Sequence, residues 1–415
     1  MWSWWREVFM NFSELVAPDG LFSDGDWIEK KDQDENGTVR LIQLADIGVC
    51  LFKDKSAKFV TEDKAQELNC TLLQKGDILV ARLPDPLGRA CIFPLDGRYI
   101  TAVDVAIVRI TQQDISPKYI MYMINSPSFR TEIKKYESGT TRKRISRKNL
   151  DKISFDIPPF PVQQSIVSRI EELFSQLDAS VAELKTAKER LKVYRQAVLK
   201  EAFDSALQDN PPMMPIEKLL TTERKGMATG PFGTMIKKHE HQVTGVPMLG
   251  IENIGNGKFI DGNKIFVTPE KAKELKSFTL LPGDIIISRS GTVGEICAVP
   301  KRMEGALLST NLMRVSLNSN TIRSDYFIYL FQSKSVVLDQ VKELCKGSTR
   351  VFLNQTILKQ IMFPVPDMSK QKAIIGVIES RMSVCDNIEK TVDAALQQAE
   401  ALRQSILKKA FEGEF

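Results

Sequence analysis

The chain contains an internal repeat that covers almost its whole length. The segment Leu41–Gly48 (LIQLADIG) is matched by Met248–Gly255 (MLGIENIG), and Lys75–Arg82 (KGDILVAR) is matched by Pro282–Arg289 (PGDIIISR); both pairs are 207 residues apart. Later matches keep this spacing to within one residue. Self-similarity at one nearly constant period indicates a tandem duplication. We therefore expect two similar units with an internal pseudo-twofold repeat.

The first part of each unit has the pattern of a mixed globule. Short β-branched runs are separated by turn pairs such as Asn36-Gly37 and Gly76-Asp77, which predicts several strands. Apolar residues at helical spacing predict one helix over Pro117–Lys135 and a corresponding one over Ser324–Lys346. The predicted fold class is therefore α+β.

The second part of each unit has the pattern of a long helix. Apolar residues recur there at alternating steps of three and four residues, which is typical of a coiled-coil seam. The predicted seam consists of Ile166, Ile170, Leu173, Leu177, Leu184, Leu191 and Val198 in the first helix, and Ile374, Ile378, Ile388, Val392, Leu402 and Ile406 in the second.

The direction of the two helices follows from chain connectivity. If the second globule is compact, the chain enters and leaves it at nearby points, so the helices run antiparallel. We expect two similar heads, one at each end of a coiled coil that sets the distance between them. The predicted boundaries are 1–160 for the first globule, 161–208 for the central helix, 209–368 for the second globule and 369–415 for the distal helix.

Composition excludes several classes of protein. A chain of 415 residues with 43% hydrophobic and 26% charged residues is typical of a globular protein of two or three domains. There is no apolar run long enough for a membrane helix. The six cysteines form no C-x-x-C pair and the two histidines have no cysteine nearby, so we expect no zinc site and a reducing, cytoplasmic location. The formal charge of +5 is only mildly basic, so local clusters must indicate any nucleic-acid partner.

The whole chain resembles the specificity (S) subunit of type I restriction–modification systems. In that family two target recognition domains alternate with two helical spacers, which is the order of parts in this chain. The stretches that carry the resemblance are Asp24–Gly48, Gly139–Phe160, Gly230–Thr234, Val246–Phe259 and Gly347–Pro366. The family often has Glu-Gln at the start of each spacer helix. Here the pairs are Val162-Gln163 and Lys370-Gln371, so only the Gln is kept.

The resemblance implies a non-catalytic subunit that reads a bipartite target in double-stranded DNA, one half with each target recognition domain. It also implies modification (methyltransferase) subunits and restriction/translocase subunits as partners. S-adenosylmethionine, ATP and Mg are expected on those partners, and no cofactor is expected in this chain. An alternative is a two-headed coiled-coil scaffold that binds proteins without DNA specificity. A methyltransferase using Asn210-Pro211-Pro212 is a third hypothesis, but we interpret this segment as the end of a helix.

A basic cluster precedes the first spacer helix. Its five cations are Arg142, Lys143, Arg144, Arg147 and Lys148. Such a cluster suits duplex phosphates, because charge neutralisation drives that affinity. A solvated charged surface is the alternative. The corresponding Gly-Ser-Thr-Arg segment of the second unit adds Lys346, Thr349 and Arg350 as candidates.

Two arginines occupy the same place in the repeat. Arg82 and Arg289 each follow an apolar strand, and Ser290 comes next in the second loop. An Arg at this point could pair with guanine or phosphate, or it could form an internal ion pair that supports the loop. We leave both alternatives open. Lys237 and Lys238, after the Gly-Pro-Phe-Gly turn, are further candidates for DNA contact.

Overall fold

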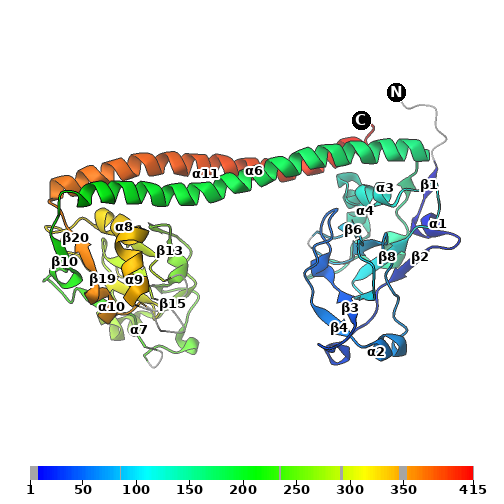
Figure 1. Ribbon diagram of the computed structural model, residues 1–415. Helices are drawn as coiled ribbons and strands as arrows, with labels where there is room; N and C mark the ends of the chain where they lie inside the picture. Colours follow the sequence, from blue (N-terminus) through cyan, green and yellow to red (C-terminus); the bar gives the residue numbers. More distant parts are fainter. Residues whose placement is uncertain (1–7, 85, 233–234, 290–292, 345–352, 415) are drawn as a thin grey trace. The chain divides into compact units, whose positions relative to one another are not determined.

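The computed structural model describes residues 8–84, 86–232, 235–289, 293–344 and 353–414. The chain divides into two compact units, whose elements are labelled in Figure 1. Unit 1 comprises Met1–Leu184 and Ala394–Phe415, and unit 2 comprises Lys185–Asp393. The two longest helices, α6 (Phe160–Leu207) and α11 (Met368–Phe411), each contribute residues to both units.

Unit 1 contains two main sheets. A four-stranded antiparallel sheet has the order β2-β8-β5-β6, and a three-stranded sheet has the order β4-β3-β7, with β3 and β7 parallel. A short pair, β1-β9, is separate. The strands are β1 (Phe9–Met10), β2 (Leu21–Asp24), β3 (Val39–Ile42), β4 (Lys58–Val60), β5 (Ile78–Ala81), β6 (Ala90–Ile92), β7 (Tyr99–Thr101), β8 (Val105–Arg109) and β9 (Phe155–Asp156).

The helices of unit 1 are short apart from α6. They are α1 (Phe12–Val16), α2 (Glu62–Glu67), α3 (Pro117–Ile124), α4 (Pro127–Tyr136) and α5 (Arg147–Leu150). The prediction of one helix over Pro117–Lys135 is therefore wrong, because the chain forms two. Ser126 caps the second helix by accepting from the Phe129 amide at 3.3 Å, and Pro127 has no amide proton with which to continue the first.

Unit 2 repeats the two main sheets and the short pair of unit 1, and adds a second short pair, β13-β14. Its sheets have the orders β11-β19-β16-β17 and β15-β12-β18, and β12 and β18 are parallel, as β3 and β7 are. The predicted α+β repeat is thereby confirmed. The strands are β10 (Met213–Pro215), β11 (Met227–Thr229), β12 (Val246–Leu249), β13 (Ile254–Gly255), β14 (Lys258–Phe259), β15 (Ile265–Val267), β16 (Ile285–Ser288), β17 (Ile296–Ala298), β18 (Leu307–Leu308), β19 (Leu312–Val315) and β20 (Met362–Pro364).

The helices of unit 2 differ in one place from the sequence prediction. They are α7 (Pro269–Glu274), α8 (Ser324–Gln332), α9 (Asp339–Leu344) and α10 (Gln355–Gln360). A π-helical turn at Lys334–Leu338 separates α8 from α9, so the prediction of one regular helix over Ser324–Lys346 is wrong. This turn buries Val336 and Val337 in the core, which accounts for the apolar spacing read as one helix.

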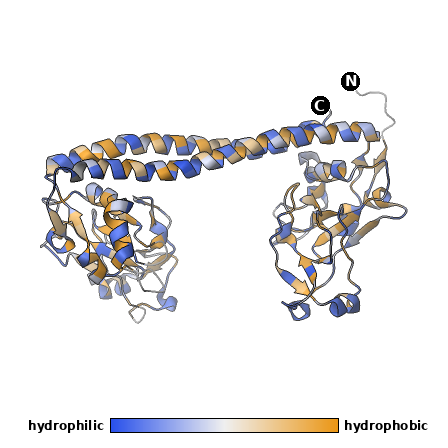
Figure 2. Ribbon diagram, viewed as in Figure 1, coloured by the Kyte–Doolittle hydropathy of each residue, from blue (hydrophilic) through white to orange (hydrophobic). Residues whose placement is uncertain are grey.

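Each four-stranded sheet is covered on both faces. In unit 1, Ile78 and Val80 face a core that includes α3 and α4, whereas Leu79 and Ala81 face a second core beneath the loops. The alternation follows from the two-residue period of a strand. In unit 2 the corresponding strand β16 divides its residues in the same way. Figure 2 shows the apolar residues concentrated in the sheets of each unit and alternating with polar ones along the long helices.

A buried glutamine fixes the start of each long helix. The Gln163 amide group donates to the Asp114 and Pro158 carbonyls at 3.0 and 2.8 Å and accepts from the Ser116 amide at 2.8 Å. Gln371 makes the same three bonds in unit 2. It donates to the Thr321 and Pro366 carbonyls and accepts from the Arg323 amide. Both side chains are fully buried. Each of these glutamines therefore joins its long helix to its globule.

The two long helices pair antiparallel within each unit. In unit 2, Lys188 forms an ion pair with Asp393 at 2.7 Å, and Arg195 forms ion pairs with Asp386 and Glu389 at 2.8 and 2.9 Å. A later residue of α6 thus pairs with earlier residues of α11, which is the pattern of antiparallel helices. In unit 1, Arg403 pairs with Asp178 and places its guanidinium 4.9 Å from the Phe174 ring. The predicted antiparallel direction is confirmed.

The predicted seam is wrong at two positions. Ile388 and Leu402 are 44% and 49% exposed. The inward positions lie one residue later, at Glu389 and Arg403, whose ion pairs with the facing helix occupy the space that an apolar residue was expected to fill. The other predicted seam residues are buried or half-buried in the structure: Ile166, Ile170, Leu173, Leu177, Leu184, Leu191, Val198, Ile374, Ile378, Val392 and Ile406.

Candidate nucleic-acid interface

One end of the four-stranded sheet in unit 1 holds a basic loop. The loop residues Ser138 and Arg144 bond each other's backbones, with both N–O distances at 2.8 Å. The buried Ile145 then donates its amide to the Arg82 carbonyl at 3.2 Å, just past the end of β5. The loop is thus attached to the sheet by both a backbone hydrogen bond and an apolar side chain.

The cations of this loop and of helix α5, which follows it, divide into two groups. Arg142, Arg144 and Lys148 have exposed side chains. Lys143 is also exposed but pairs with Glu137 at 2.9 Å. Arg147 packs back on the sheet, where it donates to the Phe22 carbonyl at 2.9 Å and lies 5.6 Å from that ring. The loop therefore presents positive charge to solvent, while Arg147 holds its base.

Arg82 lies inside the unit rather than on its surface. Its side chain is 14% exposed, forms an ion pair with Asp24 at 3.2 Å and donates to the Val103 carbonyl. Asp24 also lies 3.6 Å from Arg147. The structure therefore favours the internal ion pair over DNA contact for Arg82. Sequence reasoning missed Asp24, because nothing in its local pattern shows that two arginines from distant segments converge on it.

Arg289 takes the corresponding internal position in unit 2. Its carbonyl accepts from the Leu353 amide at 3.1 Å, as the Arg82 carbonyl does from Ile145. Its guanidinium donates to the Leu353 and Thr310 carbonyls at 3.3 and 3.2 Å. The residue is 9% exposed, and burial lowers the pKa of its guanidinium. The structure therefore favours support of the loop over DNA contact for Arg289, as it does for Arg82.

Of the remaining candidates in unit 2, two are described in the structure and four are not. Lys237 and Lys238 are exposed at the start of a 3-10 turn, η4 (Lys238–Glu240). The other four, Ser290, Lys346, Thr349 and Arg350, lie outside the described residues. Asn210-Pro211-Pro212 forms the turn after α6, with Asn210 at a positive φ of 47° and the Pro212 carbonyl accepting from Val365 at 2.9 Å.

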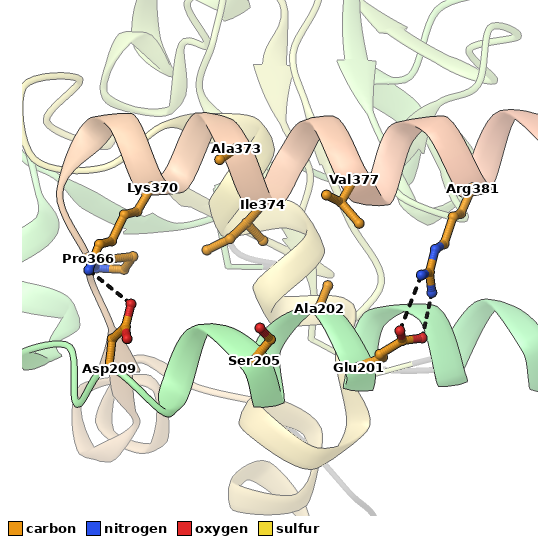
Figure 3. A pocket seen from close by; sticks show the side chains of 10 residues that line it. All are labelled: Glu201, Ala202, Ser205, Asp209, Pro366, Lys370, Ala373, Ile374, Val377 and Arg381. Carbon is orange, nitrogen blue, oxygen red and sulfur yellow. Dashed lines mark hydrogen bonds and ion pairs between the residues drawn. The ribbon is translucent and has the colours of Figure 1, made fainter.

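A cavity of about 340 Å³ lies between α6 and α11 in unit 2 (Figure 3). Asp209 and Lys370 close one end with an ion pair of 2.9 Å, and Glu201 pairs with Arg381 at the other end. Ile374 points between the two helices. The side chains that line the cavity offer no nucleophile paired with a base. Among the residues that the structure describes, no group of three or more His, Cys, Asp or Glu could hold a metal ion.

No helix within the described part of the chain is both long enough and apolar enough to cross a membrane. This agrees with the sequence, in which the two longest helices carry charged residues along their length.

Known proteins match this chain in sequence and in fold. The family model for the type I restriction modification DNA specificity domain matches twice, at residues 19–189 and 231–398. The StySPI specificity subunit of Salmonella potsdam is 25% identical over 308 residues, which cover 72% of this chain and 66% of that protein. The EcoKI specificity subunit of Escherichia coli K12 is 26% identical over 311 residues, covering 71% and 65%. The matches thus span slightly less than two thirds of these relatives.

A solved structure has the same fold. It comes from a study of complex assembly and conformational transition of the type I R-M system, and it superimposes with a TM-score of 0.67 at 15% identity, covering 99% of this chain and 98% of that one. Together with the two family matches, which follow the structural repeat, this fold identifies the family. The chain belongs to the type I restriction–modification DNA specificity family.

Proposed function

We propose that this chain is the DNA-reading subunit of a type I restriction–modification complex, and that each unit reads one half of a bipartite target. The observation that carries the proposal is the basic loop of unit 1, whose anchoring bond from the Ile145 amide to the Arg82 carbonyl recurs in unit 2 between Leu353 and Arg289. In unit 1 this loop presents Arg142 and Arg144 to solvent, and the short helix α5 that follows it adds Lys148. Exposed cations on a fixed loop suit duplex phosphates.

The two half-sites differ in this proposal. The segments after the equivalent arginines are Leu83–Gly88 (LPDPLG) in unit 1 and Ser290–Gly294 (SGTVG) in unit 2, which differ in length and chemistry. Different loops present different hydrogen-bonding groups to base edges, and base edges are where sequence is read.

In this proposal, partner subunits carry out the catalytic reactions. The chain itself is non-catalytic and holds no cofactor. Modification subunits bind S-adenosylmethionine and methylate adenine N6 after the base leaves the stack. Restriction/translocase subunits use ATP and Mg. A cytoplasmic location fits the free thiols of the described cysteines.

Co-expression with the neighbouring modification subunit tests this proposal. Mapping of N6-methyladenine in host DNA should show methylation at one bipartite motif with a fixed gap. A complex that forms but methylates no defined motif would refute DNA reading and favour the protein-binding scaffold.

A salt series on the purified chain tests the surface directly. Binding to a fluorescein-labelled duplex should weaken with salt, and the slope should fall by roughly one unit for each phosphate contact that is removed. Arg142→Ala and Lys148→Ala should each reduce the slope. Lys192→Ala on α6, where the side chain is 66% exposed, is the matched control and should leave it unchanged.

A further inference from the structure

An exposed aromatic side chain occupies the same place in both units. Trp27 is 70% exposed and Phe232 is 66% exposed. The strand registers make them equivalent: Asp24 of β2 pairs with Ala106, Thr229 of β11 pairs with the corresponding Met313, and each aromatic follows three residues later. Single exposed apolar residues are common and need no explanation. An exposed aromatic residue that recurs at one structural position in both halves of a duplication does need an explanation.

The backbone before each aromatic is held against its neighbour strand. Gly25 donates its amide to the Val105 carbonyl at 2.8 Å, and Gly230 donates to the equivalent Leu312 carbonyl at 3.1 Å. A Cβ atom at either glycine would overlap a backbone carbonyl of the adjoining loop, Ala102 in one unit and Ser309 in the other. Only glycine permits this approach, so the point from which each aromatic emerges is fixed.

An apolar anchor follows each aromatic. Ile28 packs against the core formed by the three-stranded sheet of unit 1, and Ile236 is buried in the equivalent core of unit 2. Trp27 therefore lies between two anchored residues, and Phe232 follows the anchored Gly230; both rings stay outside the core. The Trp27 indole N–H donates to the exposed Glu29 carboxylate at 3.3 Å, and the residue remains 70% exposed.

An exposed lysine completes the arrangement in each unit. Short 3-10 turns follow both aromatics, η1 (Lys30–Asp32) and η4 (Lys238–Glu240). Each turn is capped by its acidic third residue, which accepts from the preceding backbone amide at 2.9 Å in unit 1 and 2.6 Å in unit 2. Lys30 and Lys238 therefore take corresponding positions, and both are exposed. An aromatic ring and an ammonium group that are both exposed within a few residues of each other in the chain suit a nucleic acid, which offers stacked bases next to phosphates.

We infer that Trp27 and Phe232 are aromatic contacts to the DNA duplex, one in each half-site, where each ring inserts against a base step while Lys30 or Lys238 binds the adjacent phosphate. This inference rests on the proposed DNA-reading function and adds residues to it. Stacking tolerates every base because each has a π-face. The contacts therefore add affinity and local distortion of the duplex, and leave the choice of bases to other residues.

Tryptophan fluorescence tests the contact in the full-length chain. The chain has four tryptophans, so replacement of Trp2, Trp4 and Trp5 by Phe leaves Trp27 as the only one. A duplex of mixed sequence should quench Trp27 emission over the same concentration range in which it binds, as followed by anisotropy of a labelled duplex. In the same background, Trp27→Phe combined with Phe232→Trp should report the second unit in the same way.

Affinity measurements separate stacking from charge. Trp27→Ala should weaken duplex binding roughly 5- to 150-fold and leave the salt slope unchanged, because stacking releases no counterions. Trp27→Phe should retain most of the affinity. Lys30→Ala should instead lower the slope by about one.

The outcomes distinguish the inference from the proposed function. Duplex binding without quenching, together with unchanged affinity in Trp27→Ala, would overturn the aromatic contact and leave DNA reading intact. Failure of the unmodified chain to bind any duplex, alone or with the modification subunit, would overturn the DNA-reading proposal and the contact with it.

Discussion

Replacement of Arg82 by Met separates the two roles considered for this arginine. The side chain is 14% exposed, donates to the Val103 carbonyl and pairs with Asp24, so we expect Arg82→Met to lower stability without altering DNA contact. Methionine is chosen because it keeps much of the aliphatic stem that packs within the unit.

The magnitude follows from the bonds that are lost. A hydrogen bond from a charged donor contributes ~1.5–3 kcal/mol. The ion pair adds less than ~1 kcal/mol, because the Asp24 side chain is 36% exposed and water screens the pair. Nε of Arg82 is buried without a hydrogen-bond partner among the described residues, and removing that donor offsets part of the loss. The net decrease in the free energy of unfolding is about 2 kcal/mol.

Urea unfolding followed by circular dichroism measures this decrease. Arg89→Met is the positive control, because Arg89 donates to four backbone carbonyls and should cost more than Arg82→Met. Lys148→Met, at an exposed position, should leave the midpoint unchanged. A salt series on a labelled duplex completes the comparison. If Arg82→Met unfolds at the wild-type urea concentration and its salt slope falls by about one, then Arg82 contacts phosphate and the internal role is refuted.

Four further substitutions test the packing and the electrostatics. Ile406→Gln should lower stability by about 3 kcal/mol because the residue is buried, whereas Leu402→Gln, at an exposed position, should change it by less than ~0.5 kcal/mol; thermal unfolding compares them directly. Gln163→Ala should cost about 2–4 kcal/mol, because three part-buried backbone groups lose their bonds to a fully buried side chain, and equal stability to wild type would contradict the helix-anchoring role. Burial raises the pKa of Asp26 to about 6, although a hydrogen bond from the Thr71 amide opposes the shift. The contribution of this carboxyl to folding stability is therefore fully present below its unfolded-state pKa of 3.8 and is lost as the pH rises through about 6. Asp26→Asn should therefore gain thermal stability relative to wild type at pH ~7.5 but not at pH ~4, and an equal difference at both pH values would contradict this.

The repeat predicted the fold well because it constrains topology directly. Two segments that share a pattern over their whole length must bury the same positions, and the structure gives both units the same sheet order, including the parallel pairs β3-β7 and β12-β18. The helix break at Ser126 could also have been found, since Ser-Pro at that point is a helix-start signal. The π-helical turn at Lys334–Leu338 left no comparable signal.

Apolar spacing alone gave the wrong residues at two seam positions. Ile388 and Leu402 fit a three-four repeat as well as any other apolar residue, yet the inward positions hold Glu389 and Arg403. A charged residue can occupy an inward position when its partner lies on the facing helix and its stem covers apolar surface, as Arg403 does over Phe174. Single-helix periodicity contains no information on that partner.

The candidate site was predictable only as far as charge indicates exposure. The cluster at Arg142–Lys148 is correctly placed at the surface, whereas the arginines after the strands are internal. The sequence does not distinguish these cations, because an arginine whose guanidinium donates to backbone carbonyls is the same residue type as an arginine that faces solvent. Trp27 was missed for the opposite reason. Trp27 follows Gly25 by two residues, and Phe232 follows Gly230 by two residues. The flanking sequences are too different for this match to be recognised without the strand register.

Comparison of the two units separates the scaffold from the residues that face solvent. The contacts that fix the backbone occur in both: Gln163 and Gln371 at the helix starts, and the amides of Ile145 and Leu353 on the equivalent arginine carbonyls. The residues outside these anchors differ, with Arg147 in unit 1 replaced by Gln355 in unit 2, each reaching the strand that precedes the exposed aromatic. In the proposed DNA-reading function, a duplication that keeps its anchors and varies its surface holds two different reading surfaces on the same backbone. That is the arrangement an asymmetric DNA target requires, and it favours unlike half-sites over a palindrome.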